Sequence, residues 1–585
     1  MKKNALSVVL IATLIAAAST SVHSGSAFGK AHKDDSLTDR IDKLFAQWNK
    51  GDSPGCALGI IKDGRLVYGR GYGMANLSYG IPNQSNSVFL IASISKQFTA
   101  MAVLMLVQQG KLSLDDDVRK YVPELPNLGA ALTIRQLLHH TSGIRDEEAM
   151  FPLAGFREHD VITERDILDL VAAQKGLNYR PGEDFLYSNT GYTLLAIVVK
   201  RITGKSLRDF SETNIFKPLG MADSHFVDDH TTIIKNWTLG YEPVAGGGWK
   251  TSFPLFDFVG PTNVFTTIED LARWDQNFYD KRVGGQAVIE QMLKPGVLND
   301  GTEIDYAAGL FVGHWKGLRI VEHDGGDPGY RADFIRFPDQ HFSVVCLCNV
   351  TNIDPNEITR QIAEIYLADQ FKKNEVRQQL APEKRVEVSE RELAAVTGVY
   401  FNPITEIVRR IYLKEGKLMY FRGPENESEL KPLGNNRFLM VDVPVRVEVN
   451  FVPPQQPAPA KMYVVEVPDP DQTSSHSLNN TGKPNIYVAV NAVSYSSEEL
   501  AEYTGKYYSE ELDVTYILRF EDNKLALRRK KSEEAPTLTP TFVDSFNLLI
   551  ANQSGSIRFM RDQKNHLTGF TLTVRSARRL LFRKL

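Results

Sequence analysis

The chain has 585 residues, of which 67 are basic and 71 acidic, so its formal net charge is −4; 42% of the residues are hydrophobic and 24% are charged. This is ordinary globular composition, and it excludes a largely disordered, collagen-like or polytopic membrane chain. The small net charge gives no electrostatic basis for nucleic-acid binding. At roughly 100–200 residues per domain, the length predicts about three or four domains.

The N-terminus has the layout of a targeting segment. Lys2 and Lys3 precede an apolar run, residues 5–18, and small residues follow up to Ala27. A charged, apolar and small-residue succession is typical of a secretory signal, predicted here as residues 1–27. The alternative is a membrane anchor, but the run is shorter than the ~20 residues that span a bilayer. We therefore expect a periplasmic or secreted protein with no stable membrane span after signal cleavage.

The three cysteines, Cys56, Cys346 and Cys348, are too few for a disulfide scaffold. Cys346 and Cys348 lie two residues apart in an apolar run, residues 342–350, which predicts a buried strand. Both side chains then face the same side and suit the role of small buried hydrophobic residues. No histidine clusters with them, so no metal site is predicted.

Residues 36–371 show a mixture of strand and helix patterns. Segments 57–61 and 65–69 flank Lys-Asp-Gly and predict a β-hairpin. A mostly apolar segment, residues 96–109, ends at Gly110 and predicts a buried helix with a glycine cap. Further helices are predicted at 133–140, at 164–174 and after the capping signal at 267–270, and further strands at 320–322, 333–337 and 342–348. The strands gather at both ends of the region, which predicts an α/β (α+β) domain with one antiparallel sheet and a helical insert.

The C-terminal part contains an internal repeat. After a polar linker, residues 372–389, the segment 393–400 recurs as 500–507, an offset of 107 residues. Both copies continue with alternating patterns around turns, which predicts two small antiparallel β-barrels at 390–467 and 498–585. The segment 468–497 between them is rich in Pro, Ser, Asp and Asn and reads as a linker. The polar linker 372–389 also predicts that residues 36–371 hold a core of their own.

The first motif with catalytic chemistry is Ser93-Ile-Ser-Lys96, at the start of the predicted apolar helix. Serine needs a neighbouring base to become a nucleophile, and a spacing of three residues puts both side chains on one helix face. Burial lowers the pKa of a lysine towards that of a useful base. The same pattern occurs at Ser428 and Lys431, in a segment where no catalysis is expected. The structural alternative for Ser93 and Lys96 is a capping serine with a lysine whose charged end reaches the surface.

Two further motifs follow in the chain. Tyr187-Ser-Asn189 lies in a predicted loop, where the tyrosine can share a proton with a lysine and the amide can orient a substrate. His323-Asp-Gly-Gly326 follows a predicted strand, and glycines there allow a substrate to approach the strand edge. Each motif alone also has a structural reading, as a packed tyrosine or as a turn.

The three motifs in this order resemble the serine β-lactamase and penicillin-binding family, in its class C, D-aminopeptidase and esterase branch. Segments similar to other landmarks of that family are Gly71-Tyr-Gly-Met-Ala-Asn76, Leu137-Leu-His-His-Thr-Ser-Gly143, Pro218-Leu-Gly-Met221 and Asp270-Leu-Ala-Arg-Trp274. The resemblance covers residues 36–371 and implies a β-lactamase/transpeptidase-like fold. The two barrels look similar to the lipocalin-like domains that follow such catalytic domains, a looser match.

The resemblance implies roles for the motif residues. Ser93 is the acylated nucleophile, and Lys96 and Tyr187 are the proton-transfer pair, with the base role left undivided between them. Asn189 orients the substrate. For the last motif, His323 and Gly325 line the substrate-binding strand, and the N–H groups of Ser93 and Gly326 form the oxyanion hole. No metal or organic cofactor is implied, and His139 and His140 are taken as structural.

The family pattern has lysine where this chain has His323. A histidine is about neutral at pH 7 when unperturbed, so it holds a substrate carboxylate less strongly, and protonation near pH 6 should strengthen that hold. We therefore expect an exported serine hydrolase that cleaves an amide or ester, a D-amino-acid peptidase or an esterase. The alternatives are a penicillin-binding DD-carboxypeptidase or β-lactamase, and a non-catalytic binding protein. The expected partner is a small-molecule or peptide substrate, and a homo-oligomer is left open.

Overall fold

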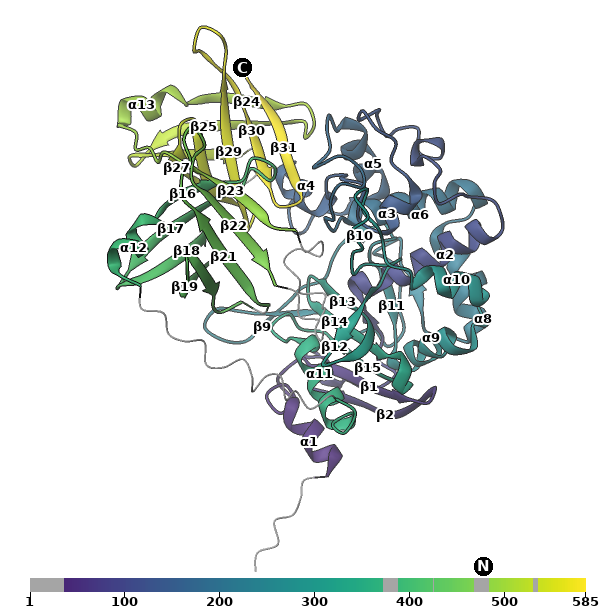
Figure 1. The fold of residues 1–585 in the computed structure, drawn as a ribbon. Coiled ribbons are helices and arrows are strands. Elements are labelled where there is room, and N and C mark those ends of the chain that lie inside the picture. Colours follow the sequence, from purple (N-terminus) through teal and green to yellow (C-terminus); the bar gives the residue numbers. More distant parts are fainter. Residues whose placement is uncertain (1–35, 372–387, 424–425, 444, 468–482, 530–534) are drawn as a thin grey trace, which may run out of the picture. The chain divides into compact units, whose positions relative to one another are not determined.

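The computed structural model describes residues 36–371, 388–423, 426–443, 445–467, 483–529 and 535–585 (Figure 1). The predicted signal, residues 1–27, and most of the predicted linker 372–389 lie outside them. The chain divides into an N-terminal unit, residues 1–43, and a second unit, residues 44–585. In the described parts of the chain, no helix combines the length and the hydropathy needed to cross a membrane.

The second unit contains a six-stranded antiparallel sheet in the order β12-β13-β14-β15-β1-β2. The pairing of β15 with β1 joins the two ends of the predicted hydrolase region. The strands β1 and β2 form the predicted hairpin. The sheet strands are β1 (Cys56–Lys62), β2 (Arg65–Tyr72), β12 (Phe311–Trp315), β13 (Leu318–Asp327), β14 (Tyr330–Phe337) and β15 (Phe342–Cys348). The predicted α/β class, with strands from both ends of the region, is confirmed.

Helices cover both faces of this sheet. A Cβ on Gly59 would lie 3.2 Å from Ile268 Cβ on α9 (Ile268–Asp280), and the opposite face contacts α11 (Pro355–Tyr366) through the hydrogen bond from Thr359 to Asp333. The helical insert between β2 and β12 holds the apolar helix α2 (Lys96–Gln108), which packs against α6 (Asn189–Thr203) and α10 (Gly285–Met292). The remaining insert helices are α3 (Ile134–Leu138), α4 (Glu147–Leu153), α5 (Glu164–Ala173), α7 (Leu207–Ser211) and α8 (Lys217–Leu219).

Short strands complete the insert. They are β3 (Met74–Asn76), β4 (Ile81–Pro82), β5 (Phe89–Leu90), β6 (Ile162–Thr163), β7 (His225–Phe226), β8 (Tyr241–Pro243), β9 (Trp249–Thr251), β10 (Phe256–Asp257) and β11 (Val264–Thr266). A helix α1 (Leu37–Leu44) begins in the N-terminal unit. The capping signal predicted at 267–270 is present, since the Thr267 side chain accepts a hydrogen bond from the Asp270 N–H at 3.1 Å.

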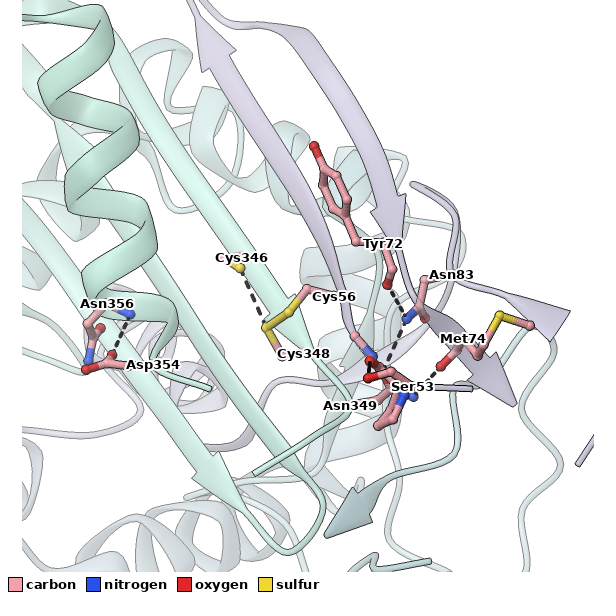
Figure 2. Close-up of a disulfide and its surroundings, with 12 residues drawn as sticks. Ser53, Cys56, Tyr72, Met74, Asn83, Cys346, Cys348, Asn349, Asp354 and Asn356 are labelled. Carbon is pink, nitrogen blue, oxygen red and sulfur yellow. Dashed lines mark hydrogen bonds between the residues drawn. A yellow bond between two sulfur atoms is a disulfide. The ribbon is translucent and has the colours of Figure 1, made fainter. Parts of the chain in front are cut away.

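The cysteines differ from the expectation that Cys346 and Cys348 both serve as small buried hydrophobic residues. Cys56 on β1 lies directly opposite Cys348 on β15 and forms a disulfide with it (Figure 2). Cys346 stays free and buried, with its Sγ 3.6 Å from that of Cys348. Because strand alternation puts residues two apart on one face, the shared direction of Cys346 and Cys348 was predictable. The pairing with Cys56 was not, since it depends on which strands become neighbours.

Two closed eight-stranded barrels follow, β16–β23 and β24–β31, as the repeat predicted. Each copy begins with a short helix, α12 (Glu390–Ala395) or α13 (Ser497–Glu502), that carries a capping box. The tyrosines of the repeat make the same contact: the Tyr400 hydroxyl donates to the Val396 carbonyl at 2.9 Å, and the Tyr507 hydroxyl donates to the Tyr503 carbonyl at 2.8 Å.

The strands of the first barrel are β16 (Gly398–Phe401), β17 (Val408–Lys414), β18 (Lys417–Gly423), β19 (Asn426–Gly434), β20 (Arg437–Met440), β21 (Val447–Val452), β22 (Lys461–Glu466) and β23 (Asn485–Val490). Those of the second are β24 (Gly505–Ser509), β25 (Val514–Glu521), β26 (Lys524–Arg529), β27 (Thr537–Phe542), β28 (Ser545–Ile550), β29 (Gln553–Arg561), β30 (Leu567–Val574) and β31 (Ala577–Lys584). The first barrel therefore extends beyond the boundary expected at residue 467, because β23 lies in the segment 468–497 that the composition assigned to a linker.

The second barrel shares its core with the hydrolase region, which the polar linker did not suggest. Their buried apolar residues form one continuous cluster, whereas the first barrel has a core of its own. The Tyr516 hydroxyl donates to the Leu153 carbonyl at 2.8 Å, and Arg145 forms an ion pair with Glu511 in which both side chains are 3% exposed. The expectation that residues 36–371 form an independent core thus has to be corrected.

Candidate active site

Ser93 and Lys96 lie at the turn that leads into the buried helix α2. A short 3-10 turn, η1 (Ala92–Ser95), carries Ser93, and Lys96 is the first residue of α2. Ala92 has a left-handed φ of 46°, which is unusual for a residue with a Cβ. Ser93 is half-buried, while Lys96 is fully buried. The turn therefore presents the serine to solvent and keeps the lysine inside.

The Lys96 ammonium donates three hydrogen bonds. Its Nζ lies 3.0 Å from Ser93 Oγ, 2.7 Å from Asn189 Oδ1 and 3.0 Å from the Pro261 carbonyl oxygen. Three acceptors match the three protons of a lysine side chain. The three acceptors therefore stabilise the protonated form of Lys96. A neutral Lys96 would turn its lone pair towards one of them, and among the three only Ser93 has a proton to give.

Burial lowers the pKa of Lys96 to about 8, against the opposing effect of nearby carboxylates, with Glu148 first among them. A lysine with this pKa is neutral in about a tenth of the molecules at pH 7. Such a group is a competent general base near neutral pH, because a useful catalytic pKa lies close to the working pH. By its pKa, Lys96 therefore suits a base near neutral pH better than Tyr187, whose pKa is raised.

Tyr187 packs its ring over the lysine, with the Lys96 Nζ 4.7 Å from the ring centroid. Burial raises the pKa of Tyr187 well above its usual value, and its hydroxyl is buried with no hydrogen-bond partner among the described residues. A tyrosinate is therefore disfavoured before substrate binds. The position next to Ser93 suits a neutral hydroxyl that passes a proton to or from the reacting groups.

His140 positions the loop that carries Tyr187. Its ring lies 4.1 Å from the Tyr187 ring, its Nδ1 accepts the Ser188 N–H at 3.1 Å, and its carbonyl accepts the Leu186 N–H at 3.0 Å. Burial, followed by repulsion from Lys96, lowers the pKa of His140 well below its usual value. His140 therefore stays neutral with its proton on Nε2, which agrees with the structural role expected for it.

A group of buried carboxyl groups surrounds the lysine, and the sequence reasoning missed it. Asp146 accepts the Asn189 N–H at 2.7 Å, and Glu147 accepts the Thr193 hydroxyl at 2.8 Å. Burial raises the pKa values of Asp146, Glu147 and Glu148, and it raises that of Asp327 to about 7. Glu148 differs from the others because it keeps an exposed surface. The sequence signal that could have found this group is the run Asp146-Glu147-Glu148, which closely follows the family segment ending at Gly143.

The third motif lies on β13 itself, which continues to Asp327 instead of ending before the glycines. The pairing with β12 stops at Glu322, so within the described sheet the segment from His323 onward has β14 alone beside it. A Cβ on Gly325 would come within 2.4 Å of the Ile91 carbonyl oxygen, so glycine is required for the approach to the Ser93 turn. Gly326 is exposed on this strand.

The expectation that His323 faces the substrate and titrates near pH 6 has to be corrected. The side chain is 1% exposed, its Nε2 lies 3.0 Å from the Tyr306 hydroxyl, and its Nδ1 lies 2.6 Å from the Asp324 carbonyl oxygen. Burial, and then repulsion from Lys96, lowers the pKa of His323 to about 3. His323 therefore stays neutral throughout the working pH range, whereas the side chain of its neighbour Asp324 is 46% exposed.

Two groups of side chains have donor atoms close enough to share a metal ion among the described residues. One is Cys56, Cys346 and Cys348, two of which form the disulfide, and the other is Asp229, His230 and Asp257. In the second group, Asp257 already accepts bonds from both the backbone N–H and the ring of His230, at 2.7 and 2.8 Å. Neither group includes a residue that contacts Ser93 or Lys96.

Lys96 contacts both Ser93 and the Tyr187 ring, so the loss of Lys96 and the loss of Tyr187 should be strongly non-additive. We expect Lys96→Ala to lower kcat/KM by ~10³-fold or more, and Lys96→Ala/Tyr187→Phe to be little worse than the worse single variant. Tyr187→Phe alone should retain a rise of kcat/KM with pH that has its midpoint near 8, the pKa of Lys96. The measurement is kcat/KM of all four proteins on one ester from pH 6 to 9. Fully additive losses would show that the two groups act separately.

Known proteins that are similar to this chain include penicillin-binding proteins and a D-aminopeptidase. The chain is 33% identical over 305 residues to penicillin-binding protein 4* of Bacillus subtilis (strain 168), which covers 49% of this chain and 66% of that protein. It is 25% identical over 466 residues to a D-aminopeptidase of Gluconobacter oxydans (strain 621H), covering 79% and 81%. The match to Protein flp of Staphylococcus aureus (strain N315) is 28% identical and covers 54% of this chain and 63% of that protein. The chain thus spans about two thirds of the length of two of these relatives.

Among solved structures, the octameric penicillin-binding protein homologue from Pyrococcus abyssi is similar, with a TM-score of 0.52 and 24% identity over 74% of this chain and 98% of that one. At 24% identity, this similarity shows a shared fold and nothing about activity. Residues 41–367, which contain the Ser93, Tyr187 and His323 motifs, match the Beta-lactamase family. With that match over more than half of its length, the chain belongs to the Beta-lactamase family.

Proposed function

We propose that this protein is an exported serine hydrolase that cleaves amides or esters through an acyl-enzyme on Ser93. The observation that carries the proposal is the 3.0 Å contact between Ser93 Oγ and the buried Lys96 ammonium, whose pKa is lowered to about 8. A half-exposed serine next to a buried amine of this pKa is an activated nucleophile. The export part of the proposal is supported by the charged, apolar and small-residue layout of residues 1–27.

The proposed reaction has two halves. Neutral Lys96 takes the proton of Ser93 while Oγ forms a bond to the substrate carbonyl carbon, and the N–H groups of Ser93 and Gly326 bind the oxyanion. The tetrahedral intermediate then expels an amine or alcohol, which receives the proton through Lys96 and Tyr187. In the second half, water attacks the acyl carbon, gives its proton to the same pair, and releases the acid while Ser93 regains its hydrogen.

The charges near Ser93 favour substrates with a positive group. Besides Lys96 and the tyrosines, the titratable neighbours in the site include neutral histidines, the half-buried Asp324, and four carboxyl groups, those of Asp146, Glu147, Glu148 and Asp327. Glu148 is the one of these four with exposed surface, so solvent and substrate can reach it. A free α-ammonium group on the substrate is the natural partner for such a carboxylate. This supports an aminopeptidase or amidase that reads peptides from the N-terminal side, and similarity to a D-aminopeptidase points to D-amino acids.

Glu148→Gln provides the test of this preference. We expect kcat/KM for a D-alanine p-nitroanilide to fall roughly tenfold, the value of a partly screened charge pair, and kcat/KM for its N-acetyl derivative and for an uncharged ester to change by less than about threefold. Glu158→Gln, at an exposed acid that pairs with Lys250, is the matched control and should change none of the three. Equal losses on all substrates would refute the ammonium-binding role.

The second candidate is a penicillin-binding carboxypeptidase or β-lactamase, favoured by the 33% identity to penicillin-binding protein 4*. Such enzymes act on substrates with a carboxylate, which the acidic surroundings of Lys96 disfavour. A fluorescent penicillin separates the candidates: we expect slow labelling of wild type compared with a neutral activated ester. Preferential labelling by penicillin would reverse the order of the two proposals, and no acylation by any reagent would favour the binding-protein alternative.

A further inference from the structure

The first barrel carries two arginines on its inner face. In the ladder between β17 and β18, Ile411 lies opposite Tyr420, and both are buried in the barrel core. Side chains two residues apart on a strand share a face, so Arg409 and Arg422 point to the same side as this pair. One step beyond the last pair of the ladder, the register places Arg409 opposite Arg422. Like charges directly opposite each other on neighbouring strands repel.

The chain supplies neutral acceptors to these arginines. Arg422 donates to Asn426 Oδ1 at 2.6 Å, to Ser428 Oγ at 2.9 Å and to Met440 Sδ at 3.2 Å. Arg409 donates from Nη1 to the Val408 carbonyl at 3.1 Å, while its Nε is buried and has no hydrogen-bond partner among the described residues. Within the described ranges, neither arginine forms an ion pair with a carboxylate.

Tyrosine hydroxyl groups complete the surroundings. Tyr420 and Tyr487, 3% and 5% exposed, are neighbours of Arg409. Burial lowers the pKa of Arg422, Tyr420 opposes this effect, and the charge of Arg409 adds to it. Both arginines are only half-buried, so a small solute can reach them. A pair of desolvated guanidinium groups costs free energy unless a counter-charge accompanies it.

We propose that the first barrel binds a small oxyanion, a carboxylate or phosphate group, between Arg409 and Arg422. The planar guanidinium group presents its N–H donors in the fork geometry that matches both groups. The unpartnered Nε of Arg409 supplies one donor, and the hydroxyl groups of Tyr420 and Tyr487 can supply others. The site is separate from Ser93, so the proposal stands or falls independently of the hydrolase activity.

Chemical protection of arginine in the wild-type protein is the first test. Phenylglyoxal modifies accessible arginines, and peptide mass spectrometry follows Arg409, Arg422 and the outward-facing, exposed Arg410 separately. We expect phosphate or acetate to slow modification of Arg409 and Arg422 at least threefold relative to sodium chloride of equal ionic strength, with Arg410 unaffected. The phosphate and acetate arms distinguish the two sources of the oxyanion. Equal protection of Arg410, or no protection by either anion, would overturn the proposal.

Calorimetric titration of variants is the second test. Removing one charge-assisted hydrogen bond weakens binding by roughly tenfold or more, so Arg409→Gln should lower the affinity for the better anion by at least that factor. Arg410→Gln, one residue away on the outer face of the same strand, is the matched control and should bind as wild type does. If Arg409→Gln binds the anion as tightly as Arg410→Gln does, the proposal fails. If Arg409→Gln does not fold, the phenylglyoxal protection experiment alone decides.

Discussion

Replacing Ser93 by alanine should abolish turnover and leave the fold intact. The side chain is half-exposed at the start of a buried helix and contributes the atom to which the acyl group would be attached, so its loss should lower kcat by ~10⁴-fold or more. The measurement is kcat on p-nitrophenyl acetate, with circular dichroism to verify the fold. A rate within tenfold of wild type would exclude the proposed nucleophile.

Mass spectrometry of the protein treated with a serine-reactive phosphonate gives an independent check of the same assignment. The label should be on Ser93, and Ser93→Ala should take up none. Ser428 is the natural comparison because a lysine also follows it by three residues. In the structure Ser428 lies on the strand β19 and accepts a hydrogen bond from Arg422, with no amine at the place that Lys96 takes next to Ser93. A label on Ser428 would contradict the assignment.

Breaking the buried ion pair between Arg145 and Glu511 should strongly destabilise the protein. We expect Arg145→Met to lower the free energy of unfolding by about 3–5 kcal/mol, because it leaves the Glu511 charge buried without its partner. The double variant Arg145→Met/Glu511→Leu should recover most of this loss, since both charges are then gone. Chemical denaturation of the three proteins measures the effect, and a double variant as unstable as the single one would argue against it.

The same variants should also affect catalysis, because the second barrel connects to the site. The Ser576 carbonyl accepts the Asp146 N–H at 3.0 Å, Asp146 accepts the Asn189 N–H, and Asn189 accepts a hydrogen bond from Lys96. We therefore expect kcat of folded Arg145→Met to fall by ~10-fold or more, and a chain ending near Glu390 to lose more activity still. Arg282→Gln, which removes an exposed ion pair with Asp280, should leave both stability and kcat unchanged.

The sequence predicted the hydrolase sheet and the barrels because their patterns are local. Two examples are the hairpin of β1 and β2 and the repeated segments around Tyr400 and Tyr507. Both depend on residues close in sequence and on the alternation of apolar and polar residues along a single strand. The Cys56–Cys348 disulfide and the Arg145–Glu511 pair depend instead on elements that are distant in the chain. No spacing rule links such residues, which is why both were missed.

His323 illustrates a different kind of failure. It was placed towards the substrate because the resembling family has a substrate-binding lysine at this position, but β13 continues through the glycines that follow. On a continuous strand His323 faces the same side as the buried residues Val321 and Asp327. The alternation was available in the sequence, and following it would have placed the histidine inside and Asp324 outside. The acidic run at Asp146 was visible too, but its place beside Lys96 depends on the packing of α4 against α6.

The pairing of β1 with β15 also determines when the sheet can form during synthesis of the chain. The paired residues Cys56 and Cys348 are 292 positions apart, so at 5–20 residues per second roughly 15–60 s pass between the synthesis of the one strand and that of the other. During this interval β1, six of whose seven residues are buried in the finished fold, has no partner on its β15 side. An unpaired apolar edge invites association with other chains. The nascent protein should therefore depend on holding chaperones until β15 has been made, and slow synthesis through the helical insert should increase its aggregation.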